Sequence, residues 1–270
     1  MSGLVPKTYP KLLEEMTWPE VAEKLEKTKT ALIPVGSIEA HGLHLPLASD
    51  TWQGVEIVKR VAAQLEKKGV IVVPGPVIPF GVCPYQLDFP GSLDFKPETV
   101  LAILKETAAS LYKNGFRNFY FILAHGGNLA IMQVAAQDIV KELEGARAVA
   151  LNWLGVMSDK YPEILKSKKT EGHSGEGETS RMLVSTPELV EMDRAKAYYP
   201  GGYEASPTAT PRYSKRTYLG GGVERPTAHF KKVTPTATVG DPLLATKETG
   251  EKLYTIICDW ICSIIEKDLK

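Results

Sequence analysis

Hydrophobic and polar positions follow two patterns along the first 154 residues. Short apolar runs are typical of buried strands, whereas longer stretches with apolar residues three or four positions apart are typical of amphipathic helices. The expected strands are residues 30–37, 70–79, 116–124 and 146–154, and the expected helices are residues 52–69, 96–115 and 129–145. Strands that alternate with helices over short connections predict an α/β fold with a mostly parallel central sheet covered by helices.

The pattern changes after Leu154. Residues 155–177 are polar and contain glycines, and a further helix is expected from Glu178 onward. Residues 196–242 are rich in Pro, Gly, Thr and Tyr, and an irregular stretch of that length is unusual in a compact protein. Because this stretch contains many tyrosines, we expect an ordered excursion that covers a site or makes subunit contacts.

The chain closes on an amphipathic helix at residues 247–270. Cys258 and Cys262 are four positions apart in it, so both are expected to face the core. The chain shows neither an internal repeat nor a convincing linker. We therefore expect residues 1–270 to form one domain.

Composition narrows the class of protein. Lys and Arg total 32 and Asp and Glu total 32, so the net charge is zero, which argues against a general nucleic-acid or anionic-membrane binder. The apolar runs fall short of the roughly 20 residues of a membrane span, and the N-terminus lacks a secretory signal. Three cysteines without a CxxC pair do not suggest a disulfide framework. We expect a soluble, cytoplasmic protein with a small-molecule substrate.

The first concentration of chemistry is the loop 36–51, "GSIEAHGLHLPLASDT". Glu39 and His41 are two positions apart, so their side chains point to the same side of an extended segment. Asp50 can return to the same point if the loop folds back. Such a mixed oxygen and nitrogen set suits Zn²⁺, Mn²⁺ or Fe²⁺. The alternative is that His41 and His44 bind the loop backbone and that Glu39 is solvated.

Two further loops carry similar residues. In "LAHGGNLA", His125 directly follows an expected strand, and Gly126 and Gly127 would let the backbone approach an ion or an oxyanion. Asn128 is interpreted as a helix N-cap. In "EGHSGEGETSRM", His173 precedes Glu178 by five positions.

The third loop and His229 also have interpretations that involve no metal binding. A glycine-rich turn into a helix could cradle phosphate, although the loop lacks the GK[ST] ending of a P-loop. Glu176 is expected to be a surface carboxylate. His229, in "RPTAHFKK", has no partner motif, so we expect no site role for it.

Together, "GSIEAHGLHLPLASD", "AHGGN" and "HSGEGETS" resemble the three motifs of the creatininase family of metal-dependent amidohydrolases, in the same order. The resemblance runs from about Met16 to the C-terminal helix. It implies a three-layer α/β/α subunit with two divalent metal ions and, commonly, assembly as a homohexamer.

The resemblance also implies roles for individual residues. Glu39 and His125 would bind one ion, His41 would bind the other, and Asp50 would bridge them. Creatininase has a further glutamate where this chain has Gly127, so Glu178 is the candidate to complete the second ion's ligands, or else a proton-transfer group. His173 matches a histidine that moves protons to the leaving group. Separately from the resemblance, the placement of Gly126 and Gly127 leads to the hypothesis that their backbone N–H groups hold the developing oxyanion.

Departures from the family pattern concern the substrate. Trp153 matches an active-site tryptophan, but Lys169 replaces a second one, with Lys168 as the neighbouring possibility, and Ala40 replaces a glutamine. Either lysine could instead be a solvated surface charge. We therefore expect a small polar, possibly cyclic or formylated substrate other than creatinine, cleaved at a C–N bond of an amide, lactam or formamide.

Three alternatives remain open from the sequence. One is a hydrolase of a cyclic diketone sugar, and another is a peptidase that trims a modified peptide. The non-enzymatic alternative is a metal-stabilised binding scaffold. A proton-transferring histidine beside an open metal position would have no use in a scaffold, because structural metal sites are closed and catalytic ones keep an open position.

Overall fold

The computed structural model describes residues 9–167, 172–200 and 229–270. Four parallel strands form a sheet in the order β2-β1-β3-β4. They are β1 (Thr30–Val35), β2 (Val73–Pro74), β3 (Asn118–Leu123) and β4 (Arg147–Leu151). The fully buried β1 lies between β2 and β3 and pairs with β3 along its whole length. The predicted parallel sheet is confirmed.

The second strand is much shorter than the predicted run of residues 70–79. Pro74, Pro76 and Pro79 fall in this run, and proline has no N–H to give to a strand ladder. Beyond β2, the Gly75 N–H donates to the Leu32 carbonyl oxygen, and an isolated bridge pairs Val35 with Ile78. This edge of the sheet therefore gives way early to a long loop at residues 75–96.

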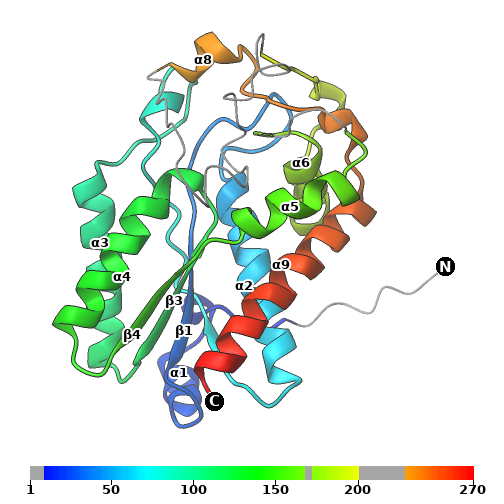
Figure 1. The fold of residues 1–270 in the computed structure, drawn as a ribbon. Helices are drawn as coiled ribbons and strands as arrows, with labels where there is room; N and C mark the ends of the chain where they lie inside the picture. The colour runs from blue at the N-terminus through cyan, green and yellow to red at the C-terminus, as the bar shows by residue number, and fades with distance from the viewer. Residues whose placement is uncertain (1–8, 168–171, 201–228) are drawn as a thin grey trace.

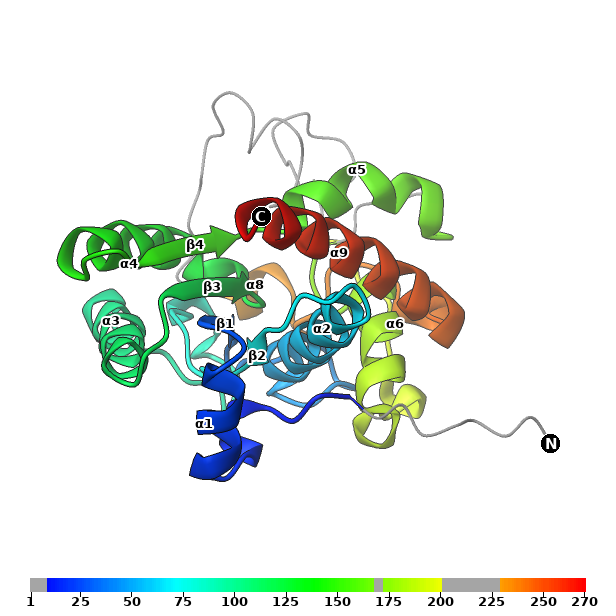
Figure 2. The ribbon, with the colours of Figure 1, turned by 90° about the horizontal axis from the view of Figure 1, so that it is seen from below.

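Helices cover both faces of the sheet, which makes the predicted three layers (Figures 1 and 2). On one face lie α3 (Pro97–Lys113) and α4 (Leu129–Glu142), and on the other lie α2 (Ser49–Glu66) and α9 (Lys247–Asp268). The remaining elements are η1 (Leu13–Glu15), α1 (Trp18–Leu25), η2 (Pro84–Gln86), η3 (Gly126–Asn128), α5 (Leu154–Ile164), α6 (Glu176–Ser185), η4 (Pro187–Leu189), η5 (Met192–Arg194), α8 (Phe230–Val233) and η6 (Pro242–Leu244).

The strand order reverses its direction between β1 and β3. From β1 the chain passes through α2 to the neighbouring β2, then returns past β1 through α3 to β3 and continues through α4 to β4. The connections thus leave β1 and β3 in opposite directions. In such sheets the ligand site lies beyond the carboxyl ends of the strands at this reversal, here after Val35 and Leu123.

The main core packs both helix layers against the sheet. Between α2 and α9, the fully buried side chains include Ile57, Val61 and Leu65 from α2 and Leu253, Ile261 and Ile265 from α9. Cys258 and Cys262 are 2% and 0% exposed on the same face of α9, which confirms their predicted orientation. All three cysteines are free thiols.

The structure corrects the sequence analysis in the second half of the chain. Residues 155–177 contain α5, which was not predicted, and α6 begins at Glu176 instead of Glu178. Most of the predicted excursion at residues 196–242 lies outside the described residues. Its described ends pair with each other through a bridge between Tyr198 and Gly240. Within the described residues, no helix is both long enough and apolar enough to cross a bilayer.

Close contact between α9 and α6 yields a test of this packing. A Cβ atom added at Gly250 would lie 2.0 Å from the Ser180 backbone oxygen. We expect Gly250→Ala to lower the free energy of unfolding by about 1–3 kcal/mol, because the strain outweighs alanine's better helix propensity. The exposed Thr255→Ala on the same helix is the control, expected within about 0.5 kcal/mol of wild type. Equal stabilities of the two variants in urea denaturation would contradict the packing.

Candidate metal centre

Six side chains meet beyond the carboxyl ends of β1 and β3. Glu39 and His41 come from the loop after β1, Asp50 from the first turn of α2, and His125 from the loop after β3. His173 precedes α6 and Glu178 lies in its first turn. We call these six residues the carboxylate–histidine cluster. The structure therefore brings together every predicted metal-ligating and catalytic residue.

Asp50 lies at the centre of the carboxylate–histidine cluster. Its Oδ1 is 3.1 Å from His41 Nε2, and its Oδ2 is 3.0 Å from His125 Nδ1. The sequence analysis placed Asp50 in the loop after β1, but it belongs to α2. A rigid helix therefore positions its side chain. Each carboxylate oxygen thus faces a different histidine.

The other carboxylates extend this arrangement to either side. Glu39 Oε1 is 3.3 Å from His125 Nδ1, and Glu178 Oε2 is 3.8 Å from His41 Nε2. In the group of His41, Asp50 and Glu178, one possible ligand atom from each residue lies within 4.8 Å of the others. Two overlapping sets of donors result, with Asp50 common to both.

Backbone carbonyls orient both histidines. His41 Nδ1 is 3.0 Å from the Glu39 carbonyl oxygen, and His125 Nε2 is 3.1 Å from the Val82 carbonyl oxygen. A carbonyl can only accept, so each of these ring nitrogens donates its N–H. The opposite nitrogen of each ring, which faces Asp50, is left as the one able to bind a cation. Metal-binding histidines are commonly oriented in this way.

The charges are those of a site built for cations. Burial would raise the pKa of Glu39, but His125 and His173 lower it to about 2. Burial would lower the pKa of His41, but Asp50, Glu178 and Glu39 raise it to about 10. His125 likewise has its pKa raised well above its usual range, against burial, with Glu39 as the largest opposing cause. Without metal, protons on the histidines therefore compensate the buried carboxylates.

His173 differs from the other two histidines. Burial and then the charge of His41 lower its pKa. Its Nε2 is 2.7 Å from the Ala40 carbonyl oxygen, and its Nδ1 is 4.0 Å from Glu39 Oε1. The ring also lies against those of His41 and Phe230. His173 is therefore a neutral imidazole with one nitrogen turned toward the carboxylates.

Sequence reasoning missed two residues of the loop after β2. The Cys83 thiol contacts Glu39 Oε2, and Gln86 Nε2 is 3.2 Å from His173 Nε2. Both residues are fully buried. The only available signal was position, because this loop also follows the carboxyl end of a strand. Its proline-rich approach and the lack of a motif gave no reason to single it out.

The tryptophan predicted to contact substrate lies outside the cluster. Trp153 lies in the main core, 2% exposed, with its indole N–H donating to the Leu123 carbonyl oxygen and Arg181 packed over its ring. Its predicted contact with substrate stays a prediction. Lys169 and the neighbouring Lys168 lie outside the described residues.

Gly127 is required by a close backbone approach. A Cβ atom there would lie 2.3 Å from the Val82 carbonyl oxygen, so a glutamate could not occupy this position without displacing the loop after β2.

Asn128 occupies the N-cap position of α4, but its side chain makes no cap hydrogen bond. Instead, Asn128 accepts from Val82 N and donates to the Gly36 carbonyl oxygen, which ties the two loops together.

Three further expectations can be compared with the structure. Glu176 was wrongly predicted to be exposed: it is fully buried and accepts hydrogen bonds from the backbone N–H groups of Lys166 and Ser167. His44 binds Thr179 Oγ1 through Nε2 at 2.8 Å and does not join the cluster. His229 is exposed, with its Nδ1 3.0 Å from Asp88 Oδ2, and it is not part of the cluster.

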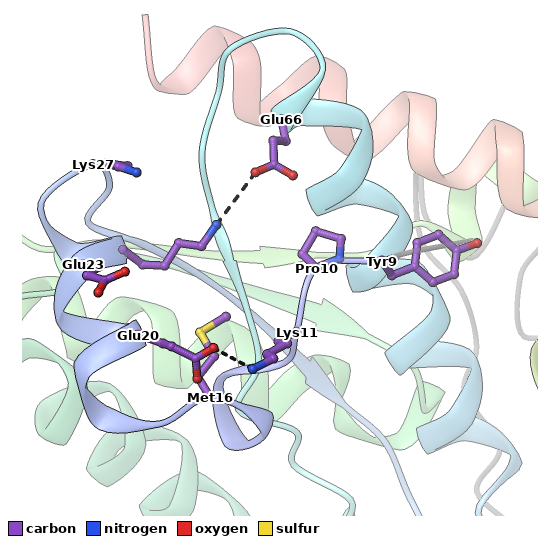
Figure 3. Close-up of a pocket in the computed structure, with 9 residues that line it drawn as sticks. Tyr9, Pro10, Lys11, Met16, Glu20, Glu23, Lys27 and Glu66 are labelled. Atoms are coloured by element: carbon purple, nitrogen blue, oxygen red, sulfur yellow. Dashed lines mark hydrogen bonds and ion pairs between the residues drawn. The ribbon is translucent and has the colours of Figure 1, made fainter. Parts of the chain in front are cut away.

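A surface hollow elsewhere on the molecule is unrelated to this chemistry. It lies between α1, the segment before it and the end of α2, and it includes the ion pairs Lys11–Glu20 and Lys24–Glu66 (Figure 3). Glu66 ends α2, whereas Asp50 begins it. The hollow is therefore at the opposite end of that helix from the carboxylate–histidine cluster.

Comparison with known proteins places this geometry in context. The sequence model of the family described as "Creatininase: Creatinine amidohydrolase" matches residues 14–265. The chain is 27% identical to the 3-dehydro-scyllo-inosose hydrolase of Thermotoga maritima, over 93% of this chain and 81% of that protein. It is 28% identical to the mycofactocin precursor peptide peptidase of Mycobacterium ulcerans, over 90% and 83%.

Solved structures show the same fold. A Bacteroides fragilis protein described as a creatinine amidohydrolase superposes with a TM-score of 0.79, at 28% identity over 96% of each chain. A creatininase in a manganese form superposes with a TM-score of 0.73, at 22% identity over 95% of this chain and 98% of that one. A glutamate-to-glutamine mutant creatininase in a zinc–zinc form superposes with a TM-score of 0.74, at 22% identity over 96% of this chain and 99% of that one.

The buried His44 leads to a pH prediction. Burial and then the charge of His41 lower its pKa to about 4, against about 6.5 in the unfolded chain. A lowered histidine pKa contributes stability above about pH 6.5 that is lost as the pH falls toward about 4. In chelator, wild type should lose about 3 kcal/mol more unfolding free energy than His44→Gln between these pH values. Parallel profiles in urea denaturation would contradict a neutral His44.

Proposed function

The chain belongs to the creatininase family of hydrolases, and on that basis we propose that it binds two divalent cations in the carboxylate–histidine cluster and cleaves a C–N bond of a small polar substrate. The observation that carries this proposal is the position of Asp50 between two histidines whose outer nitrogens are bound to backbone carbonyls. Once cations displace the protons that these nitrogens carry in the metal-free protein, that arrangement would offer one nitrogen from each histidine and a shared carboxylate to two neighbouring cations.

Each cation would have its own ligands. Glu39 and His125 would hold the first, and His41 and Glu178 the second, with Asp50 binding both. The distances of 3.3 Å between Glu39 and His125 and 3.8 Å between His41 and Glu178 support this division. Glu178 would thus supply the carboxylate that cannot come from position 127. Mixed carboxylate and imidazole donors suit Zn²⁺ and Mn²⁺, and Fe²⁺ remains a third candidate.

The buried charge supports cation binding independently. Burying the two carboxylates of Glu39 and Asp50, with the partly buried Glu178 beside them, is costly unless positive charge lies close by. A bound pair of cations would polarise a carbonyl and make hydroxide available from water near neutral pH. The protein's part is to hold Asp50 rigidly on α2 and to keep the surroundings dry, with Glu39, His41 and Asp50 each less than 5% exposed.

His173 is proposed to transfer a proton to the leaving nitrogen. Its Nδ1 is 4.0 Å from Glu39 Oε1, and it lies within reach of Glu39 and His41 as a possible ligand atom, so a proton-transfer role has to be separated from metal binding by experiment. A histidine whose pKa is below its usual range gives up a proton readily once it has acquired one. The Ala40 carbonyl oxygen, which accepts from His173 Nε2, fixes the ring in place on its far side. The backbone at Gly126 and Gly127 stays our candidate for holding the developing oxyanion.

The substrate class is proposed from chemistry and relatives together. An amide, lactam or formamide would use the metal-activated attack and the proton from His173 directly. The relatives act, by name, on an inosose and on a precursor peptide, so a cyclic diketone sugar and a modified peptide are the alternatives. A binding scaffold is disfavoured because His173 would have no role. Homohexameric assembly and a cytoplasmic location remain predictions.

Metal content tests the proposed centre. By plasma mass spectrometry, wild type should hold about two transition-metal ions per chain. Asp50→Ala should lose both, because each oxygen serves a different ion, and Glu178→Ala should lose one. The exposed Glu188→Ala is the control and should match wild type. Wild type that stays metal-free after readdition, or a Glu178→Ala variant with full content, would contradict the assignment.

Replacing the proposed proton donor should separate turnover from metal binding. We expect His173→Gln to keep wild-type metal content and to lose at least about 100-fold in turnover of the best substrate from a panel of lactams, formamides, cyclic diketones and short peptides. The size of glutamine preserves contacts with Ala40 and Gln86 while removing the titratable group. Unchanged turnover would rule out His173 as the proton donor, and loss of metal would make it a ligand.

A further inference from the structure

Cys83 is held rigidly beside the metal centre by the loop after β2. Its backbone N–H donates to Asp94 Oδ1 at 2.8 Å, and the preceding N–H of Val82 donates to Asn128 Oδ1 at 3.0 Å. Gln86 N donates to the Cys83 carbonyl oxygen at 3.3 Å. Three hydrogen bonds therefore fix this turn of the loop, and the Cys83 side chain is fully buried.

The thiol faces the same carboxylate as His125. Cys83 Sγ contacts Glu39 Oε2, while Glu39 Oε1 is 3.3 Å from His125 Nδ1. In the group of Glu39, Cys83 and His125, one possible ligand atom from each residue lies within 4.8 Å of the others. Val82, whose carbonyl orients His125, immediately precedes Cys83. One short segment thus both orients the histidine and presents a sulfur to its cation.

We propose that Cys83 is a thiolate ligand of the cation held by Glu39 and His125. The inference rests on the proposed two-metal function. As the cation binds, the S–H bond breaks, the proton leaves to solvent, and the sulfur electron pair forms the metal–sulfur bond. The thiol gives up its contact with Glu39 Oε2 in the same step.

The consequence is a difference between the two metal positions. A cation with Cys83, His125, Glu39 and Asp50 has sulfur, nitrogen and oxygen ligands, and thiolate selects Zn²⁺ over Mn²⁺. The other position, with His41, Asp50 and Glu178, has only nitrogen and oxygen ligands and accepts either metal. The chain therefore discriminates against Mn²⁺ at the first position alone.

The competing role for Cys83 is to position the Glu39 carboxylate by donating its S–H to Glu39 Oε2. Both roles make the same contact in the absence of metal, and both would lower activity when the thiol is removed. A spectroscopic signature of the metal–sulfur bond distinguishes them, because only a ligand has that bond.

The experiment loads the metal-free full-length protein with Co²⁺ and records its absorption spectrum. Bound Co²⁺ gives visible ligand-field bands whatever its donors, and a thiolate adds an intense near-ultraviolet charge-transfer band. We expect both in wild type, and loss of only the charge-transfer band in Cys83→Ser. Cys258→Ser is the matched control, since Cys258 is a buried thiol of α9 whose nearest hydrogen-bond partner is the Ile57 carbonyl oxygen. It should retain both bands.

The outcomes separate the two proposals. Ligand-field bands without a charge-transfer band in wild type would overturn the thiolate ligand and leave the metal centre intact. Neither kind of band in wild type would overturn the metal centre itself. A second measurement, on wild type alone, is needed in case Cys83→Ser folds poorly. In competition between the two metals, Zn²⁺ should displace Mn²⁺ from one position at least about tenfold more readily than from the other. Equal displacement from both would contradict the inference.

Discussion

The carboxylate of Asp50, placed between His41 and His125, is the interaction on which the rest of the site depends. One side chain on the first turn of α2 joins the loop after β1 to the loop after β3. Such a buried carboxylate is costly unless cationic partners surround it. The same requirement explains why both histidines are oriented by backbone carbonyls and why Glu39 lies beside His125 and Glu178 beside His41.

The sheet makes this arrangement possible. Because the connections from β1 and β3 run in opposite directions, the loops at their carboxyl ends diverge and leave room between them. Asn128 joins the loop after β1 to the loop after β2, because its side chain binds the Gly36 carbonyl oxygen and the Val82 N–H. The packing of α6 against α9 then places Glu178 beside His41 and His173 beside Glu39. Distant segments of the chain therefore share one centre.

The sequence predicted those parts of the structure that depend on local spacing. Alternating strands and helices identified the fold, and the carboxyl ends of two strands identified Glu39, His41 and His125 as neighbours. Contacts between loops were beyond such reasoning: Cys83 meets Glu39 across 44 positions. Glu176 was misjudged because its partners are backbone N–H groups of residues 166 and 167, which no side-chain pattern reveals. The burial of Trp153 against Leu123 and Arg181 was also beyond such reasoning, because family resemblance does not fix how an indole packs.

The most direct test of the shared carboxylate is anomalous diffraction from crystals of the zinc-loaded protein. The account predicts two anomalous peaks about 3.5–4 Å apart, one on either side of Asp50. The first should lie within bonding distance of Glu39 and His125, and the second within bonding distance of His41 and Glu178. A single peak, or two peaks that do not share Asp50, would contradict it.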